Sequence, residues 1–146
     1  MNRISLILLI LFSSWAFAQE KILVDLEEAD QLSLEVTELM FEEEFDEAFN
    51  LLALYFPFNK GDLQNLAGKF KLEIDQLQKS YGTMLSVEKG AVYDVSNIRR
   101  RIIYYLRYDY FALRLNFEFH NSKKGWVLIG FKYSDQLEDD FIKVDN

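Results

Sequence analysis

The stretch FALRLNFEFHN, residues 111–121, decides the fold prediction, because its apolar and polar residues alternate over almost the whole length. A period of two places successive side chains on opposite faces of a β-strand. The apolar face is predicted to carry Leu113, Leu115, Phe117 and Phe119, and the polar face Arg114, Asn116, Glu118 and His120. Residues 122–125 (SKKG) then predict a hairpin turn, and residues 126–133 the returning strand.

Two more strands are predicted before this hairpin. Residues 98–109 are rich in β-branched and aromatic side chains, which favour strands. Residues 83–94 also have strand character, with an interruption at Lys89 and Gly90. The second half of the chain therefore predicts a four-stranded antiparallel sheet.

The first half of the chain has helical periodicity instead. Apolar residues recur at intervals of three and four in residues 25–41, 45–56 and 62–81. Pro57 is predicted to end the second helix, Asp62 to cap the start of the third, and Gly82 to cap its end. Three N-terminal helices packed on a curved four-stranded antiparallel sheet make a two-layer α+β domain. Residues 135–146 are predicted to form a short helix or a tail.

The first eighteen residues have the three parts of a cleavable export signal. Arg3 supplies a positive charge, residues 4–12 (ISLILLILF) are nearly all apolar, and Ala16 and Ala18 are small residues at a cleavage site. The apolar run is shorter than the roughly 20 residues that a membrane-spanning helix needs. We therefore predict cleavage between Ala18 and Gln19. The mature chain, residues 19–146, is expected to be one soluble periplasmic or secreted domain with no stable membrane anchor.

Composition excludes several classes of function. The chain has no cysteine, so thiolate metal sites, cysteine nucleophiles and disulfide bonds are all excluded. Its formal net charge is −8, which disfavours nucleic acid as a partner. The charge is also unevenly distributed, because residues 20–50 are strongly acidic and residues 95–134 are basic.

The stretches FEEEFDEAFNLL, residues 41–52, and RRRIIYYLRYDYFALRLNFEFHNSKKGWVLIGFKYSD, residues 99–135, carry a family resemblance. They resemble the helical entry and closing strands of the nuclear transport factor two-like superfamily, a cystatin-like α+β cone. The nearest likeness is to small exported bacterial domains of uncharacterised function. Glu43 and Glu44 stand where that family commonly has a helix-breaking glycine. The resemblance implies a pocket between helices and sheet and a homodimer through the open sheet face, but no single reaction.

Asp109 is the candidate catalytic base, because it lies among tyrosines that include Tyr105, and a carboxylate in an apolar pocket can abstract a proton. The alternative is a turn residue between two strands, a position that aspartate favours. His120 is the only histidine and is a third catalytic candidate, with a solvated surface position as its alternative. With Glu118 as its one local carboxylate, it does not predict a metal site.

Three aromatic residues are candidates for contacting a ligand, although each has packing in the core as its alternative: Tyr104, Tyr108 and Trp126. The run of arginines at residues 99–101 has an anion site as one interpretation. Its structural alternative is protection of the sheet or pairing with the acidic helices. Alternation predicts Arg99 and Arg101 on one face of the strand and Arg100 on the other.

The leading functional expectation is non-enzymatic binding of a small apolar ligand or a protein partner, without a cofactor or a metal. The alternative is a small isomerase or hydro-lyase that uses Asp109 with a tyrosine in a cone-shaped pocket. A third possibility is recruitment of a partner by the outward sheet face, which predicts an exposed apolar patch around Ile103 and Tyr105.

Overall fold

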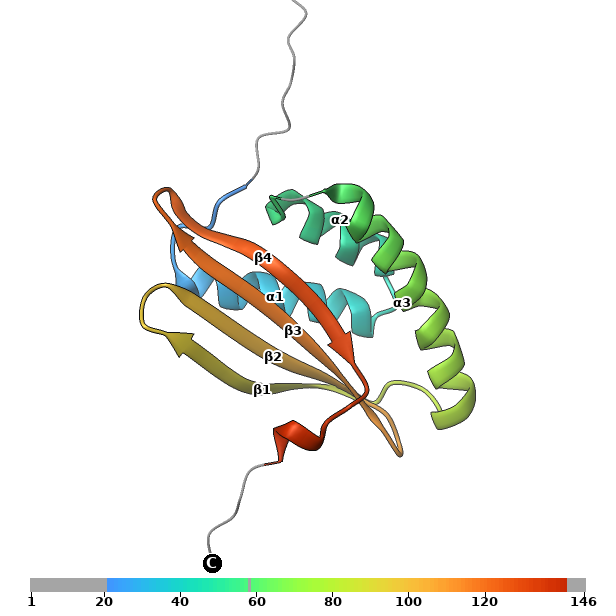
Figure 1. The fold of residues 1–146 in the computed structure, drawn as a ribbon. Coiled ribbons are helices and arrows are strands. Elements are labelled where there is room, and N and C mark those ends of the chain that lie inside the picture. The colour runs from blue at the N-terminus through green and yellow to red at the C-terminus, as the bar shows by residue number, and fades with distance from the viewer. Residues whose placement is uncertain (1–20, 58, 142–146) are drawn as a thin grey trace, which may run out of the picture.

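Helices precede strands along the chain, and together they form an α+β fold (Figure 1). The computed structural model describes residues 21–57 and 59–141, so the predicted export signal lies outside the described residues. The elements in order are α1 (Leu26–Phe41), α2 (Phe45–Tyr55), α3 (Lys60–Tyr81), β1 (Ser86–Val95), β2 (Arg99–Arg107), β3 (Ala112–Ser122), β4 (Gly125–Ser134) and the 3-10 turn η1 (Glu138–Asp140). The prediction of three helices and a four-stranded antiparallel sheet is confirmed. The first helix follows a non-helical segment, residues 21–25, so the helices are not strictly N-terminal.

The sheet is a meander in which each strand pairs with the next, in the order β1-β2-β3-β4. The predicted interruption in the first strand is a register shift between Lys89 and Val92. A second shift, between Glu118 and Phe119, was not predicted. The alternation in β3 is confirmed, because its burial follows a strict period of two from Leu113 to Phe119.

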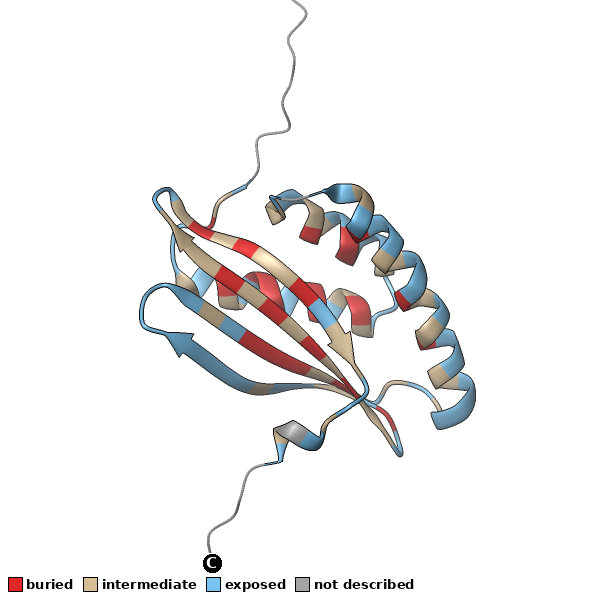
Figure 2. Cartoon of the chain, in the orientation of Figure 1, coloured by how far each residue is buried: buried red, intermediate tan, exposed pale blue. Residues whose placement is uncertain are grey.

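One face of the sheet is covered by helices, and the core lies between the two layers. Helix α1 lies across the sheet, whereas α2 and α3 lie toward the β4 side (Figure 1). Buried residues form stripes along the central strands and on the facing side of α1 (Figure 2). Rings meet edge to face across the layers, since Phe49 of α2 lies 5.8 Å from Phe131 of β4, between ring centroids.

The junction between α1 and α2 shows how this chain makes a sharp break without glycine. Glu43 takes a left-handed backbone conformation, with φ of 62°. Such a conformation is uncommon for a residue with a side chain, and glycine is its usual occupant. The two helices therefore separate where the sequence pattern suggested, although a glutamate stands at the break.

The start of α3 differs from the prediction. Its cap is Asn59, whose side-chain oxygen accepts a hydrogen bond from the backbone N–H of Gly61 at 2.9 Å. Asp62 lies inside the first turn instead, where a carboxylate is favoured by the positive end of the helix dipole. Both residues are suitable near a helix start, so composition alone did not distinguish them. At the other end of α3, Gly82 is the C-cap with φ of 83°, as predicted.

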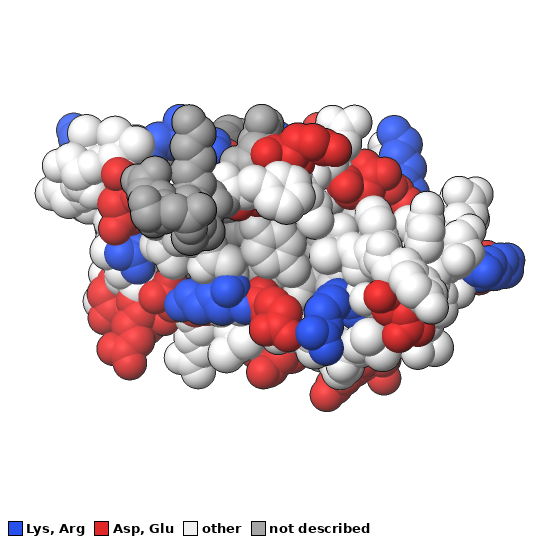
Figure 3. Space-filling view, turned by 90° about the horizontal axis from the view of Figure 1, so that it is seen from below, with Lys and Arg blue, Asp and Glu red and all other residues white. Residues whose placement is uncertain are grey.

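The arginines of β2 divide between the two faces of the sheet as predicted. Arg100 faces the helices, where it forms ion pairs with Asp94 at 2.8 Å and with Asp30 of α1 at 3.5 Å. Arg99 and Arg101 lie on the opposite face, and both pair with Glu118 of β3. Acidic and basic side chains alternate on the face seen from below as well (Figure 3). The ion pairs of residues 99–101 support the structural interpretation of the arginine run, in which the arginines pair with acidic side chains.

The outward sheet face is partly covered by the chain after β4. Arg114 donates hydrogen bonds to both carboxylate oxygens of Asp140 in η1, at 2.7 and 2.8 Å. Ile103 is 4 % exposed on this face, and Tyr105 is only partly exposed. Ile103 therefore contributes almost nothing to an apolar surface patch.

Candidate functional site

Asp109 lies where its turn interpretation placed it. It is exposed in the connection between β2 and β3, outside both strands. Its carboxylate approaches the C-cap of α3, where a Cβ on Gly82 would lie 2.9 Å from Oδ2. A general base in an apolar pocket needs a buried carboxylate, and this geometry does not provide one.

The candidate tyrosines do not converge on Asp109 or on one another. Tyr104 is buried and faces the helical layer, whereas its neighbour Tyr105 lies on the opposite sheet face beside Asp140. Tyr108 is 2 % exposed, and its hydroxyl has no hydrogen-bond partner among the described residues. Burial, with a smaller effect of the Glu43 carboxylate, raises the pKa of Tyr108 to about 12. At neutral pH this hydroxyl stays protonated and cannot act as a base.

His120 and Trp126 also occupy separate places. His120 is partly exposed on the outward face of β3, where it pairs in register with Val127 and Arg99. Trp126 is 6 % exposed and belongs to the core. None of the catalytic candidates therefore shares a cleft with another. Among residues 21–57 and 59–141, no three His, Cys, Asp or Glu side chains gather to hold a metal ion.

Trp126 has a structural role that the sequence did not reveal. Its backbone exchanges two hydrogen bonds with Leu23, at 2.9 and 2.8 Å, so that residues 21–24 run beside the start of β4. Gly125 is needed there because a Cβ would lie 2.6 Å from the carbonyl oxygen of Leu23, and because its φ is 134°. The Gly-Trp pair therefore holds the first described segment on the sheet.

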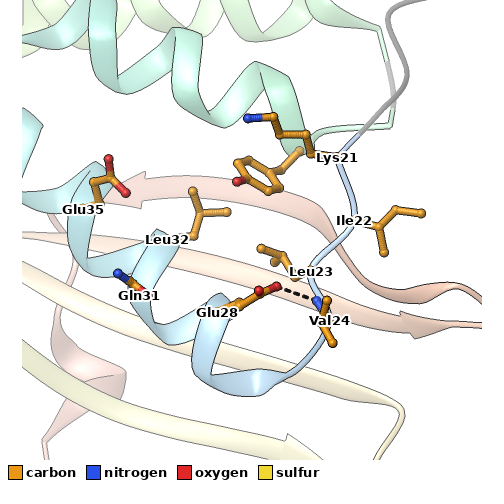
Figure 4. Close-up of a pocket in the computed structure, with 9 residues that line it drawn as sticks. Lys21, Ile22, Leu23, Val24, Glu28, Gln31, Leu32 and Glu35 are labelled. Atoms are coloured by element: carbon orange, nitrogen blue, oxygen red, sulfur yellow. Dashed lines mark hydrogen bonds between the residues drawn. The ribbon is translucent and has the colours of Figure 1, made fainter.

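A hollow of about 410 Å³ lies between this segment and α1 (Figure 4). Two of its three charged side chains, Glu28 and Lys21, are already engaged. The Glu28 carboxylate accepts a hydrogen bond from the backbone N–H of Val24 at 2.6 Å, and the Lys21 ammonium lies 5.7 Å from the Tyr55 ring centroid. These contacts connect the segment to α1 and α2, which indicates a structural role for the hollow.

The resemblance implied a pocket between the helices and the sheet. An open hollow of about 480 Å³ lies between α3, at Leu66 and Glu73, and the second half of β4. Under α1, in contrast, core side chains fill the space between helix and sheet. Val36 and Met40 of α1 and Leu115 and Phe117 of β3 are completely buried there. A cleft of about 660 Å³, larger than the hollow beside α1, lies within the helical layer, between α2 and α3. Its apolar lining is formed by Phe49, Ala53, Leu54, Leu63 and Ala67.

Gly68 forms part of this cleft, and the fold gives no packing reason for a glycine there. It lies in the middle of α3, and a Cβ built on it would meet nothing within 4 Å. A glycine inside a helix costs about 0.5–1 kcal/mol relative to alanine. The chain therefore gives up helix stability at an exposed position that lines the cleft.

Polar and charged groups stand around the apolar lining. Asp46 of α2 and Lys71 of α3 form an ion pair of 2.5 Å. Lys60, Gln64 and Asn50 are exposed at the cleft. Apolar walls with a few polar groups at the edge are the usual construction of small-molecule sites.

The cleft is not among the sites predicted from the sequence, because it carries no reactive side chain such as a histidine or a buried carboxylate. Its signal was present in the small residues Ala53, Ala67 and Gly68 on two adjacent helices. Small side chains leave space only if two helices pack side by side, and the sequence did not give that arrangement.

No protein-family model, curated protein or solved structure matches the chain. The likeness to the nuclear transport factor two-like superfamily therefore stays a prediction. Across the part of the chain that the structure describes, no helix has both the length and the apolar character needed to cross a bilayer.

Proposed function

We propose that this protein is an exported, non-enzymatic domain that binds a small apolar ligand in the cleft between α2 and α3. The observation that carries the proposal is the apolar cleft itself, whose edge at Gly68 carries no side chain in the middle of a helix. The walls add surface that water solvates poorly, including Leu54, which is 43 % exposed. A ligand with an apolar body would remove that surface from water.

Export is part of the proposal and rests on residues 1–18. Their charged start, apolar run and small residues at the cleavage site support release of the chain from the cytoplasm after cleavage at Ala18. A distant relationship to the nuclear transport factor two-like superfamily is compatible with the order of helices and strands. The proposal of binding does not depend on that relationship.

The absence of catalysis is supported by the positions of the candidate residues. Asp109 is exposed in a turn, and Tyr105 lies on the opposite sheet face from Tyr104. The proton-transfer alternative needed a carboxylate and a tyrosine together in one apolar pocket. Those groups lie apart from each other and outside the cleft between α2 and α3.

The test of the binding proposal is a titration of the purified protein with decanol, followed by NMR chemical shifts of backbone amides. We expect shifts to concentrate at Ala53, Ala67 and Gly68. The variant Gly68→Leu should lose binding because its side chain enters the cleft. Gly68→Ala is the matched control, expected to raise the free energy of unfolding by about 0.5–1 kcal/mol and to keep most of the binding. Shifts spread evenly over the surface, or full binding by Gly68→Leu, would contradict the proposal.

A second candidate function is binding of a protein partner, and the partner we propose is a second copy of the chain. The specific observation is the outer edge of β1, which pairs with β2 on one side only among the described strands. Val92, Tyr93 and Val95 on this strand are 37 %, 53 % and 62 % exposed. Exposed apolar edge strands tend to pair with another strand. Sedimentation should show a dimer that Val92→Lys weakens, and a monomer at all concentrations would exclude this candidate.

A further inference from the structure

We infer that the ligand of the α2–α3 cleft carries an acidic group on an apolar body, and that Lys60 binds this group. The inference rests on the proposed function and adds the chemical class of the ligand. A carboxylate with a hydrocarbon chain, such as a medium-chain fatty acid, has this construction.

The charge around the cleft is opposite in sign to that of the protein. The whole chain has a formal net charge of −8. The charged residues that line the cleft are Lys60, Lys71 and Asp46, so the lining has one positive charge in excess. A local positive charge on an acidic protein favours an anion at this position over others on the surface.

The excess charge can be assigned to one side chain. Lys71 and Asp46 neutralise each other through their ion pair of 2.5 Å. Lys60 has no carboxylate within ion-pair distance among the described residues, and it is exposed at the cleft. Lys60 is therefore the cation that remains for a ligand.

The two lysines lie at opposite ends of the cleft. Lys60 is the first residue of α3 and lies near Leu54, at the end of α2, while Lys71 pairs with Asp46 at the start of α2. Lys71 lies eleven helical positions after Lys60, a rise of about 16 Å. Apolar wall residues lie between them, including Leu63 and Ala67. An apolar chain therefore fits along the cleft with its acidic group at Lys60.

The experiment compares two probes of equal chain length, decanoate and decanol, by titration of the purified protein at pH 7. In the variant Lys60→Gln, we expect affinity for decanoate to fall about two- to five-fold, the range that an exposed ion pair contributes. Affinity for decanol should stay within experimental error. Lys69→Gln is the matched control, because Lys69 is exposed on the same helix and does not line the cleft.

The outcomes separate this inference from the proposed function. If both probes bind and Lys60→Gln leaves decanoate unchanged, or weakens both probes equally, the acidic ligand is wrong while the apolar cleft stands. An equal loss of decanoate affinity in Lys69→Gln would also overturn the inference, because the effect would then follow net charge. If neither probe binds to the unmodified protein, the proposed function itself fails.

Discussion

Helices α1 and α3 differ in how they are held, and the difference explains where the molecule has a cleft. Six of the 16 residues of α1 are buried, but only three of the 22 residues of α3. Figure 2 shows the same contrast, with buried positions frequent on α1 and sparse on α3. Helix α1 packs on the sheet, whereas α3 packs beside α2 and contacts the sheet through a few large rings. Length does not decide a helix's contribution to the core; the surface it covers does.

The two helices therefore have different roles: α1 closes the core, and α3 borders the cleft. Helix α1 and the sheet share a closed core, in which a ligand would have to displace packed side chains. Helix α3 has fewer buried side chains, and the cleft lies along its contact with α2. Regions with few buried apolar contacts open at lower free energy than the core, which suits a ligand site.

The largest expected loss of stability is at Phe70, in the middle of α3. Phe70 is completely buried, and its ring contacts Phe45, Phe49 and Tyr133 at centroid distances of 5.5, 5.7 and 4.9 Å. Phe70→Ala should lower the free energy of unfolding by about 3–5 kcal/mol, because it removes these contacts and leaves a cavity. Urea denaturation measures the change.

The control for Phe70 is Leu72→Ala on the same helix. Leu72 is 68 % exposed, so its truncation should change stability by less than about 0.5 kcal/mol. Similar losses in the two variants would show that α3 is held evenly along its length, and the contrast with α1 would be wrong.

A second group of aromatic rings packs at the C-terminal end of α3. We expect the free energy of unfolding that this group contributes to fall at alkaline pH. Tyr81 of α3 stacks on Phe111 at 5.2 Å, and Phe111 lies 5.9 Å from Tyr108. The pKa of Tyr108 is raised by burial from 10.0 to about 12, so its neutral form is favoured in the folded state. That stability is fully present below pH 10 and is lost as pH rises from 10 to 12. The loss is roughly 3 kcal/mol, at about 1.4 kcal/mol per pKa unit.

Tyr108→Phe should remove this part of the alkaline loss, because phenylalanine does not titrate. It also removes a buried hydroxyl without a partner, so stability at pH 7 should be unchanged or higher. Unfolding followed by circular dichroism between pH 8 and pH 12 measures both effects. An equally steep alkaline loss in the variant would assign the effect to other groups, such as Tyr133, whose pKa is also raised to about 12.

The smallest expected effect concerns the polar connection of α1 to the sheet. Arg100 joins Asp94 of β1 to Asp30 of α1, and its hydrogen bonds lower the pKa of the Asp94 carboxyl below 3.8. A lowered carboxyl pKa stabilises the fold above pH 3.8, and that contribution is lost as pH falls further. Because the Asp94 side chain is 43 % exposed, Asp94→Asn should cost no more than about 1 kcal/mol at pH 7. Thermal unfolding at pH 7 and at pH 3 measures the cost, which should shrink at the lower pH.

Asp75→Asn is the control for Asp94, because Asp75 pairs with Lys79 on a fully solvated part of α3. We expect a change near zero at both pH values. If the two variants behave alike, the Arg100–Asp94 pair contributes no more than a surface ion pair.

Periodicity predicted the elements because each strand or helix here follows one pattern. The alternation of residues 111–121 matched the burial of β3, and the spacing of apolar residues matched the three helices. Cap positions were less certain, as Asn59 and Asp62 show, because several nearby residues satisfy the same hydrogen-bonding requirement.

The candidate site was not predictable in the same way. A pocket depends on which helices are neighbours, and the periodicity of α2 and α3 does not state their relative placement. Cover on the outward face likewise depends on residues distant in the sequence, such as Asp140, which binds Arg114. Reactive side chains point to Asp109 and the tyrosines, whereas the apolar part of the cleft is formed largely by alanine and leucine, which carry no such signal.

The bridge between Leu23 and Trp126 has a consequence for the order in which the molecule assembles. The two residues are about 100 positions apart, and their pairing joins the first described segment to the last strand. Synthesis proceeds from the N-terminus, so Leu23 emerges from the ribosome long before its partner exists. Closing so long a loop slows folding, because its entropy is lost before the contact forms. The final structure therefore has to wait for β4, and the earlier helices remain without their complete partner surface until that strand arrives.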